Sequence, residues 1–173
     1  LHRARQALDG DAVILYGDLL FRRYVLGDLL DAPGDIVAVV DSALPAADSP
    51  DYRDLAFCSA ADDRALFRQD VNLLRVAPGG DPDCGRPDGR WLGMLRVRGV
   101  GRTQLLAALD GLAAQPDFAV LGMPELLNRL IGDGAAVKVH YIHGHWLDVN
   151  RLEDLSRAGD FAHGHPAAGF REP

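Results

Sequence analysis

Two short apolar segments, each followed by an aspartate, constrain the fold more than any other feature. Residues 11–16 (DAVILY) precede Asp18, and residues 35–40 (DIVAVV) precede Asp41. Between them, residues 19–30 carry apolar side chains at the spacing of a helix. This order of strand, acidic turn, helix and strand predicts an α/β fold with a mixed, mostly parallel sheet.

The composition limits the number of domains and the classes of partner. A chain of 173 residues suffices for one domain, predicted at 1–161, with a loose tail at 162–173. The net charge of -7 disfavours nucleic acid and anionic membranes as partners, and no apolar run is long enough to span a bilayer. Cys58 and Cys84 show no metal-binding spacing, which indicates reduced thiols in a cytoplasmic protein. The first residue is Leu, which suggests a fragment or an excised domain.

Further elements follow from periodicity and from residues that favour turns. We expect strands at 71–76, 91–97 and 136–142, a loop at 78–89 and a turn at 144–150. Helices are expected at 103–114, capped by Thr103, at 124–131 and at 151–158.

The first candidate site is Gly17-Asp18, at the carboxyl end of the first predicted strand. Ligands of open α/β sheets bind beyond such strand ends, and a carboxylate there suits a hard cation that carries phosphate oxygens. Gly17 would permit close approach of the backbone. The structural alternative is that Asp18 caps the helix predicted from Leu19, and spacing alone favours this alternative.

The second candidate is the segment 140–150 (HYIHGHWLDVN). One interpretation is a zinc site, as in a hydrolase, built from His140, His143 and His145. On a strand, however, His140 and His143 would point to opposite faces, because they are three residues apart. A blander interpretation is a polar strand end with hydrogen-bonded histidines. In a third, Asp148 alone holds a metal ion while the histidines shape an anionic pocket.

Three further residues are weaker candidates. Gly93 lies inside a predicted strand, where a glycine marks either a bulge or a close backbone approach. Glu125 begins a predicted helix, whose dipole its carboxylate would stabilise. Lys138 is the only lysine beside 17 arginines, a bias that GC-rich coding explains, and it could also be a solvent-facing strand residue.

Several strings together resemble one family. These are residues 16–21 (YGDLLF), 35–42 (DIVAVVDS), 91–93 (WLG) and, most specifically, 139–150 (VHYIHGHWLDVN) with 152–155 (LEDL). They are similar to the nucleotidyltransferase domain often fused to phosphoenolpyruvate mutase, itself similar to sugar-phosphate nucleotidyltransferases and phosphonate cytidylyltransferases. The resemblance covers about Val13 to Phe161.

The resemblance implies a three-layer α/β sandwich like that of nucleoside-diphosphate-sugar transferases. It implies Asp18 and Asp148 as catalytic ligands of Mg²⁺, which aligns and neutralises phosphates. The implied reaction transfers CMP from CTP to a small phosphonate, as in phosphonate biosynthesis, and releases pyrophosphate. Lys138 would assist catalysis, and the substrate-binding residues would include Gly17, Gly93, Glu125, His143 and His145.

Two positions depart from the family pattern. The family's glycine-rich nucleotide-binding loop has no match in residues 1–15, which suggests a fold incomplete at its N-terminus, a shortened variant or an inactive one. Arg90 stands before Trp91, where relatives often carry an acidic residue. The alternatives are therefore a sugar- or choline-phosphate nucleotidyltransferase, or a non-catalytic remnant that docks on a mutase domain.

Overall fold

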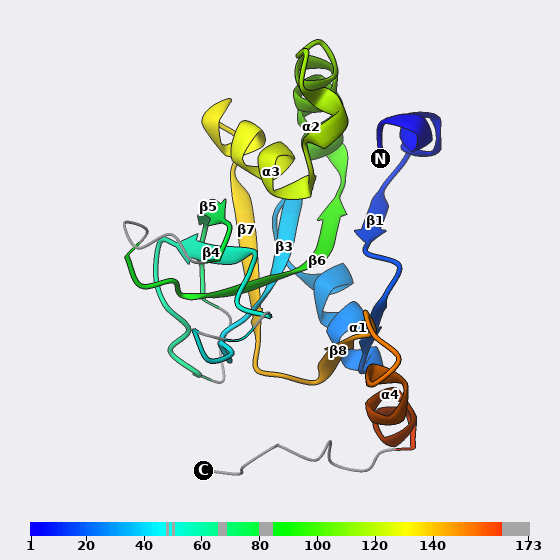
Figure 1. The fold of residues 1–173 in the computed structure, drawn as a ribbon. Helices are drawn as coiled ribbons and strands as arrows, with labels where there is room; N and C mark the ends of the chain where they lie inside the picture. The colour runs from blue at the N-terminus through cyan, green and yellow to red at the C-terminus, as the bar shows by residue number, and fades with distance from the viewer. Residues whose placement is uncertain (48, 50, 66–68, 80–84, 164–173) are drawn as a thin grey trace.

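The structure, a computed structural model, describes residues 1–47, 49, 51–65, 69–79 and 85–163. Its centre is a mixed sheet in the order β5-β4-β6-β3-β7, with β1 also paired to β6 (Figure 1). The strands are β1 (Ala12–Leu15), β3 (Ile36–Asp41), β4 (Leu55–Cys58), β5 (Leu73–Ala77), β6 (Gly89–Val97) and β7 (Val137–Ile142). Within the described residues only β3 and β7 pair in parallel.

The predicted mostly parallel sheet is therefore wrong, because β6 runs antiparallel to each of its neighbours β1, β3 and β4. A strand that returns in the opposite direction needs no crossover helix, and strand order in the sequence does not reveal it. The α/β class itself is confirmed, since helices cover both faces of the sheet.

Alternation along β3 separates the two faces. Ile36, Ala38 and Val40 join the core under α2 (Gly99–Ala113) and α3 (Met123–Gly132). Val37 and Val39 instead pack with Val25 and Leu29 of α1 (Arg23–Asp31). These two apolar clusters give the predicted three layers, with β3 buried along its whole length.

Arg96 ties α1 to the sheet. Its guanidinium donates to the carbonyl oxygens of Leu30, Ala32 and Gly34, at 2.7, 2.9 and 2.6 Å. Carbonyls at the end of a helix have no partner within the helix, so a buried arginine at this point stabilises the connection from α1 into β3.

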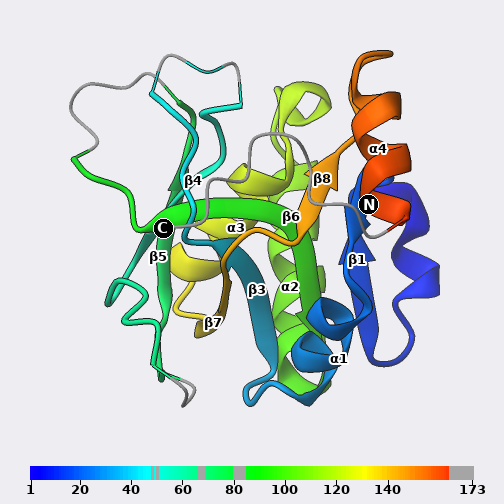
Figure 2. The same ribbon diagram turned by 90° about the horizontal axis from the view of Figure 1, so that it is seen from below.

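A second, smaller sheet lies beside the main one. It pairs β2 (Leu19–Phe21) with β8 (Trp146–Asp148), and α4 (Asp154–Ala162) follows β8 (Figure 2). A helix from Leu19 is thus wrong for its first turn, because residues 19–21 pair with a distant segment and α1 begins only at Arg23. The turn predicted at 144–150 likewise contains β8.

The other expected elements are largely present, with shifted ends. Helix α2 begins at Gly99, so Thr103 lies inside the helix and does not cap it. Helix α4 begins three residues later than expected, and β4 was not predicted. Short 3₁₀ helices occupy His2–Ala7 and Phe118–Val120. Part of the predicted 78–89 loop, Cys84 and the 164–173 tail lie outside the described residues.

None of the helices in the described part of the chain combines the length and the apolar character that crossing a membrane would require.

Candidate active site

Asp18 and Asp148 are brought together by the small sheet. Leu19 pairs directly with Asp148, and the Val149 N–H donates to the Asp18 carbonyl oxygen at 2.9 Å. Asp18 therefore does not cap a helix, and the two aspartates, 130 positions apart, lie at the same end of the β2–β8 pair. The N-cap interpretation fails because the backbone after Asp18 is extended.

A chain of hydrogen bonds links the two carboxylates. The Asn150 side-chain amide, oriented with its nitrogen toward Asp18, donates to Asp18 Oδ2 at 2.9 Å and accepts from Arg53 at 3.1 Å. Arg53 also lies 3.3 Å from Asp148 Oδ2, and Arg90 lies 2.5 Å from that same oxygen. One carboxylate oxygen thus receives two guanidinium groups.

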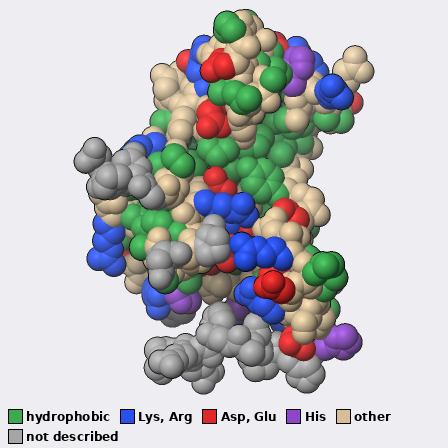
Figure 3. All heavy atoms as spheres, in the orientation of Figure 1, with side chains coloured by type: hydrophobic (Ala, Val, Ile, Leu, Met, Phe, Trp, Pro, Cys, Tyr) green, Lys and Arg blue, Asp and Glu red, His purple; other side chains and the backbone are tan. Residues whose placement is uncertain are grey.

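Four of these residues, Arg53, Arg90, Asp148 and Asn150, line a cavity of about 670 Å³, here called the arginine cavity. The same lining holds two further arginines, Arg151 and Arg157, and four further carboxylates, those of Asp41, Asp51, Glu153 and Asp154. Figure 3 shows blue side chains, interleaved with red ones, over the region of β6, β8 and α4. Guanidinium groups bind phosphate oxygens in a bidentate manner, so the arginine N–H groups that do not contact these carboxylates suit a phosphorylated ligand.

Asp41 organises the loop at the edge of this cavity. It is 4% exposed and accepts hydrogen bonds from the backbone N–H groups of Ala43 and Gly144, both at 2.9 Å, and from Trp146 Nε1 at 2.6 Å. A buried carboxylate with three donors is well satisfied. Asp41 was not among the predicted site residues, although it ends a strand much as Asp18 follows one.

The histidines do not gather at one point. His145 lines the arginine cavity and its Nδ1 lies 2.5 Å from the Tyr24 hydroxyl, whereas His143 contacts Ser42 and Arg64. In the portions of the chain that the structure describes, no group of three or more His, Cys, Asp or Glu side chains is placed to hold a metal ion. The zinc interpretation of His140, His143 and His145 therefore has no geometric support.

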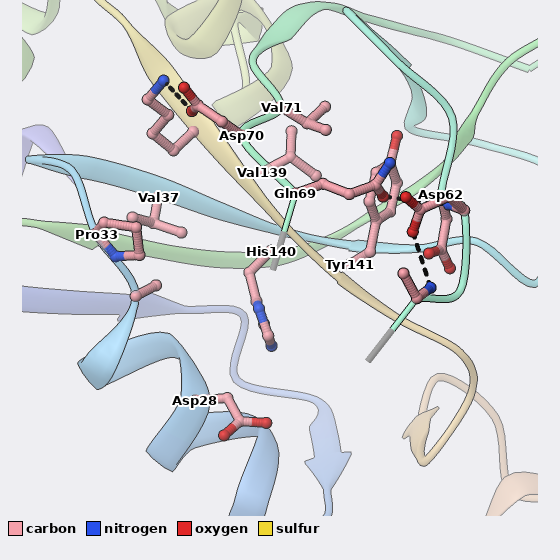
Figure 4. A pocket seen from close by; sticks show the side chains of 14 residues that line it. Asp28, Pro33, Val37, Asp62, Gln69, Asp70, Val71, Val139, His140 and Tyr141 are labelled. Atoms are coloured by element: carbon pink, nitrogen blue, oxygen red, sulfur yellow. Dashed lines mark hydrogen bonds and ion pairs between the residues drawn. The ribbon is translucent and has the colours of Figure 1, made fainter. Parts of the chain in front are cut away.

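Lys138 lies at a different cavity, of about 700 Å³, here called the carboxylate cavity. Its lining includes Lys138, His140 and four aspartates: Asp28, Asp62, Asp63 and Asp70. Lys138 is ion-paired with Asp70 at 2.5 Å, and Figure 4 shows Asp70 and His140 at different ends of this cavity. The structure thus does not bring Lys138 to the cavity that Asp148 lines.

Gly93 and Glu125 have local structural roles. Gly93 adopts φ +80° at a bulge in β6, and a Cβ atom there would collide with the ring of Tyr16. The close approach predicted for Gly93 is therefore made by the chain itself. Glu125 accepts a hydrogen bond from the Gly122 N–H at 2.7 Å, which caps α3. Gly17 faces open space, so packing does not require a glycine there.

Burial perturbs two groups beside this site. Desolvation raises the pKa of Tyr16 to about 12, with a smaller contribution from Asp54 and another from Asp18. Desolvation also raises the pKa of Asp54, against the opposing effect of Arg53 and Arg90. Acidic groups beside the arginines are thus shielded from water, which strengthens electrostatic interactions at the site.

The fit of Mg²⁺ differs between the two aspartates. Asp18 Oδ1 is buried and accepts no hydrogen bond from any described residue, so it could serve as a cation ligand. Asp148 fits that role less well, because both arginines already contact its Oδ2 atom and its side chain is only 14% exposed. The arrangement therefore does not match a magnesium site built from both carboxylates.

Asp18, Asp148 and His145 were predicted as site residues and lie in this region, whereas Arg53 and Asn150 were not predicted. Asn150 belongs to the most specific motif of the family resemblance, which was the available signal. Arg53 lies in a stretch without a recognisable pattern, and only the fold brings it to Asp148.

The sequence matches no protein-family model and no curated protein. Solved structures do match. The inositol-1-phosphate CTP transferase from T. maritima is 11% identical with a TM-score of 0.63, over 95% of this chain and 62% of that one. The UTP-bound UGPase from Acinetobacter baumannii is 12% identical with a TM-score of 0.63, over 97% and 56%.

A nucleoside-diphosphate-sugar pyrophosphorylase from Vibrio cholerae RC9 is 16% identical with a TM-score of 0.55, over 92% of this chain and 59% of that one. The chain thus spans about three fifths of the length of these structures. At such identities the likeness concerns the fold alone, and the fold resembles that of nucleotidyltransferases that act on sugar and inositol phosphates.

Proposed function

We propose that this chain forms the acceptor-side part of a nucleotidyltransferase site, which transfers a nucleotidyl group to a small phosphonate or phosphate monoester. The observation that carries the proposal is the meeting of Asp18 and Asp148 at the end of the β2–β8 pair, beside the arginine cavity. The fold likeness to nucleotidyltransferases supports the reaction class. The family resemblance of residues 139–150 favours CTP and a phosphonate as substrates.

In the proposed reaction, an oxygen of the acceptor attacks the α-phosphorus of the nucleoside triphosphate. A new P–O bond forms, the bond to the β-phosphate bridging oxygen breaks, and pyrophosphate leaves with that electron pair. No covalent enzyme intermediate is needed, so the protein contributes alignment and charge neutralisation. Mg²⁺ enters the proposal as the counter-ion of the triphosphate substrate.

Arginines of the cavity perform that neutralisation on the acceptor side. Arg90 and Arg53 are held in place by Asp148, and Arg157 lies 3.4 Å from Asp154 at the start of α4. Asp154 in turn accepts backbone hydrogen bonds from Arg151 and Asn150, which lower its pKa. Fixed guanidinium groups lose little entropy when an anion binds, so they favour tight and oriented binding.

The test is release of pyrophosphate by the full chain. The protein is supplied with each nucleoside triphosphate in turn, Mg²⁺, and 2-hydroxyethyl- or 2-aminoethylphosphonate, with inositol 1-phosphate as a comparison acceptor. We expect acceptor-dependent pyrophosphate that Asp148→Asn reduces about 100-fold, while the matched substitution Asp70→Asn at the carboxylate cavity leaves it unchanged. Absence of acceptor-dependent release with every nucleotide would contradict the proposal and favour a non-catalytic role.

A further inference from the structure

Arg90 is an unusual charged residue in this fold. It is 7% exposed, its guanidinium contacts Asp148 Oδ2 at 2.5 Å, and its central carbon lies 4.8 Å from the centroid of the Trp146 ring. Its Nε atom is buried and donates to no described residue. A buried guanidinium with an unused donor is costly unless a ligand accepts that hydrogen bond.

The position of Arg90 is fixed from two sides. Trp146 covers one face of the guanidinium, and the Trp146 ring is itself anchored by its Nε1–H bond to Asp41. Asp148, the last residue of β8, forms an ion pair with the same guanidinium group. Because both holders are part of the folded scaffold, the cation is in place before any ligand arrives.

A divalent ion at Asp148 would have to compete with this arrangement. Its approach to Oδ2 would displace a guanidinium from an ion pair whose side chains are 8% and 14% exposed. It would also stand beside two positive charges: the buried Arg90, whose repulsion water screens little, and the half-exposed Arg53.

We infer that Arg90 takes the place of a metal ion at Asp148. Asp148 is then a positioning residue that holds Arg90, and Arg90 donates its remaining N–H groups to a phosphonate or phosphate oxygen in the arginine cavity. The inference rests on the proposed function for the identity of the ligand. Whether Arg90 or a metal ion pairs with Asp148 does not depend on turnover, so it can be tested without substrates.

The first experiment measures Mn²⁺ binding to the full chain by electron paramagnetic resonance, without nucleotide. We expect Arg90→Gln to raise Mn²⁺ affinity about tenfold, or to create a site where the wild type has none, because it frees Asp148. Arg90→Lys, which keeps the charge, is the matched control and should leave affinity unchanged. The double variant Arg90→Gln with Asp148→Asn should lose the gain.

Two outcomes overturn the inference. One is that Arg90→Gln binds Mn²⁺ no more tightly than the wild type. The other is that Asp148→Asn binds Mn²⁺ more weakly than the wild type. Thermal melting of each variant checks the fold. If Arg90→Gln does not fold, the comparison of Asp148→Asn with wild type still decides, because a metal ligand cannot be removed without weakening the site.

The second experiment measures methylphosphonate binding by ³¹P nuclear magnetic resonance. We expect Arg90→Gln to weaken binding about tenfold, since a charge-assisted pair is lost, and Arg157→Gln, at the more exposed arginine of the same cavity, to weaken it less. Unchanged methylphosphonate binding in Arg90→Gln would contradict the ligand role of Arg90. If Arg90→Gln gains Mn²⁺ affinity as expected but the wild type releases no pyrophosphate, the proposed function is refuted and the role of Arg90 at Asp148 stands.

Discussion

The two cavities differ in how their charges are held. At the arginine cavity, Asp41, Arg90 and Asp148 are largely buried and each contacts more than one group. Asp41 and Arg90 both contact the Trp146 ring. At the carboxylate cavity, Asp70 is 84% exposed on its side chain and contacts Lys138. Exposed pairs are screened by water and contribute little to stability, whereas buried charges are costly to leave unpaired. Charge networks that a fold buries despite that cost are candidates for function.

The largest expected effect concerns Asp41. Asp41→Ala removes one buried acceptor and leaves two backbone N–H groups and the Trp146 indole without a partner, so we expect a loss of about 3 kcal/mol in the free energy of unfolding. Urea denaturation measures it. Asp70→Ala, the matched change at the other cavity, should cost less than about 0.5 kcal/mol. Similar losses in both variants would remove the distinction between the cavities.

The next prediction separates the cavities by activity. Asp18→Asn should lower kcat of the proposed transfer about 100-fold, because the buried carboxylate is lost from the site, while Lys138→Gln should change it less than about twofold. Initial rates of pyrophosphate release measure both. A large loss in Lys138→Gln would show that the carboxylate cavity takes part in the reaction.

The third prediction compares the stability contributions of a buried and a half-exposed arginine at the arginine cavity. Arg90→Gln should cost about 2 kcal/mol in unfolding free energy because it leaves Asp148 partly buried without its nearest partner. Arg53→Gln should cost less than about 1 kcal/mol, since the Arg53 side chain is 47% exposed and lies 3.3 Å from Asp148. Equal costs in paired urea titrations would mean that burial does not set the strength of these pairs.

The smallest effect is the pH dependence contributed by Asp54. Burial raises its pKa, so the folded state binds the proton more tightly than the unfolded state does. Stability from this group is therefore present at low pH and is lost as pH rises from the ordinary aspartate pKa through the raised one. Asp54→Asn, at φ +51° where asparagine is tolerated, should flatten this part of the stability curve. If the dependence of stability on pH is the same in Asp54→Asn as in the wild type, another group is responsible for it.

Local patterns predicted much of the fold. The buried strand at 35–40, the strands near 91–97 and 136–142 and the helix near 124–131 have clear apolar periodicity or continuous apolar runs, and all are present. Sheet direction could not be predicted, because β6 takes its antiparallel place only through long-range pairing. The pairing of residues 19–21 with 146–148 overrides a helical pattern for the same reason.

The candidate site was predictable in part. Asp18 and Asp148 each lie at the end of a β-segment within the strings that resemble the family, so local sequence signalled both. Their hydrogen-bonded link through Asn150 and Arg53 depends on the tertiary structure. The contact between Arg90 and Asp148 could not be predicted from the sequence either, because the two residues lie 58 positions apart.

The ribbon of β2 and β8 has only three residue pairs, and the partnership between Asp18 and Asp148 depends on their alignment. Side chains on a strand alternate between faces, so a slip of one residue would turn Asp148 away from Arg90 and toward the opposite side. Short ladders open more readily than the strands of a buried sheet. Assembly of the proposed site is thus a local equilibrium of this ribbon. Deuterium uptake at Leu20 and Leu147 would follow that equilibrium while the central strands remain protected.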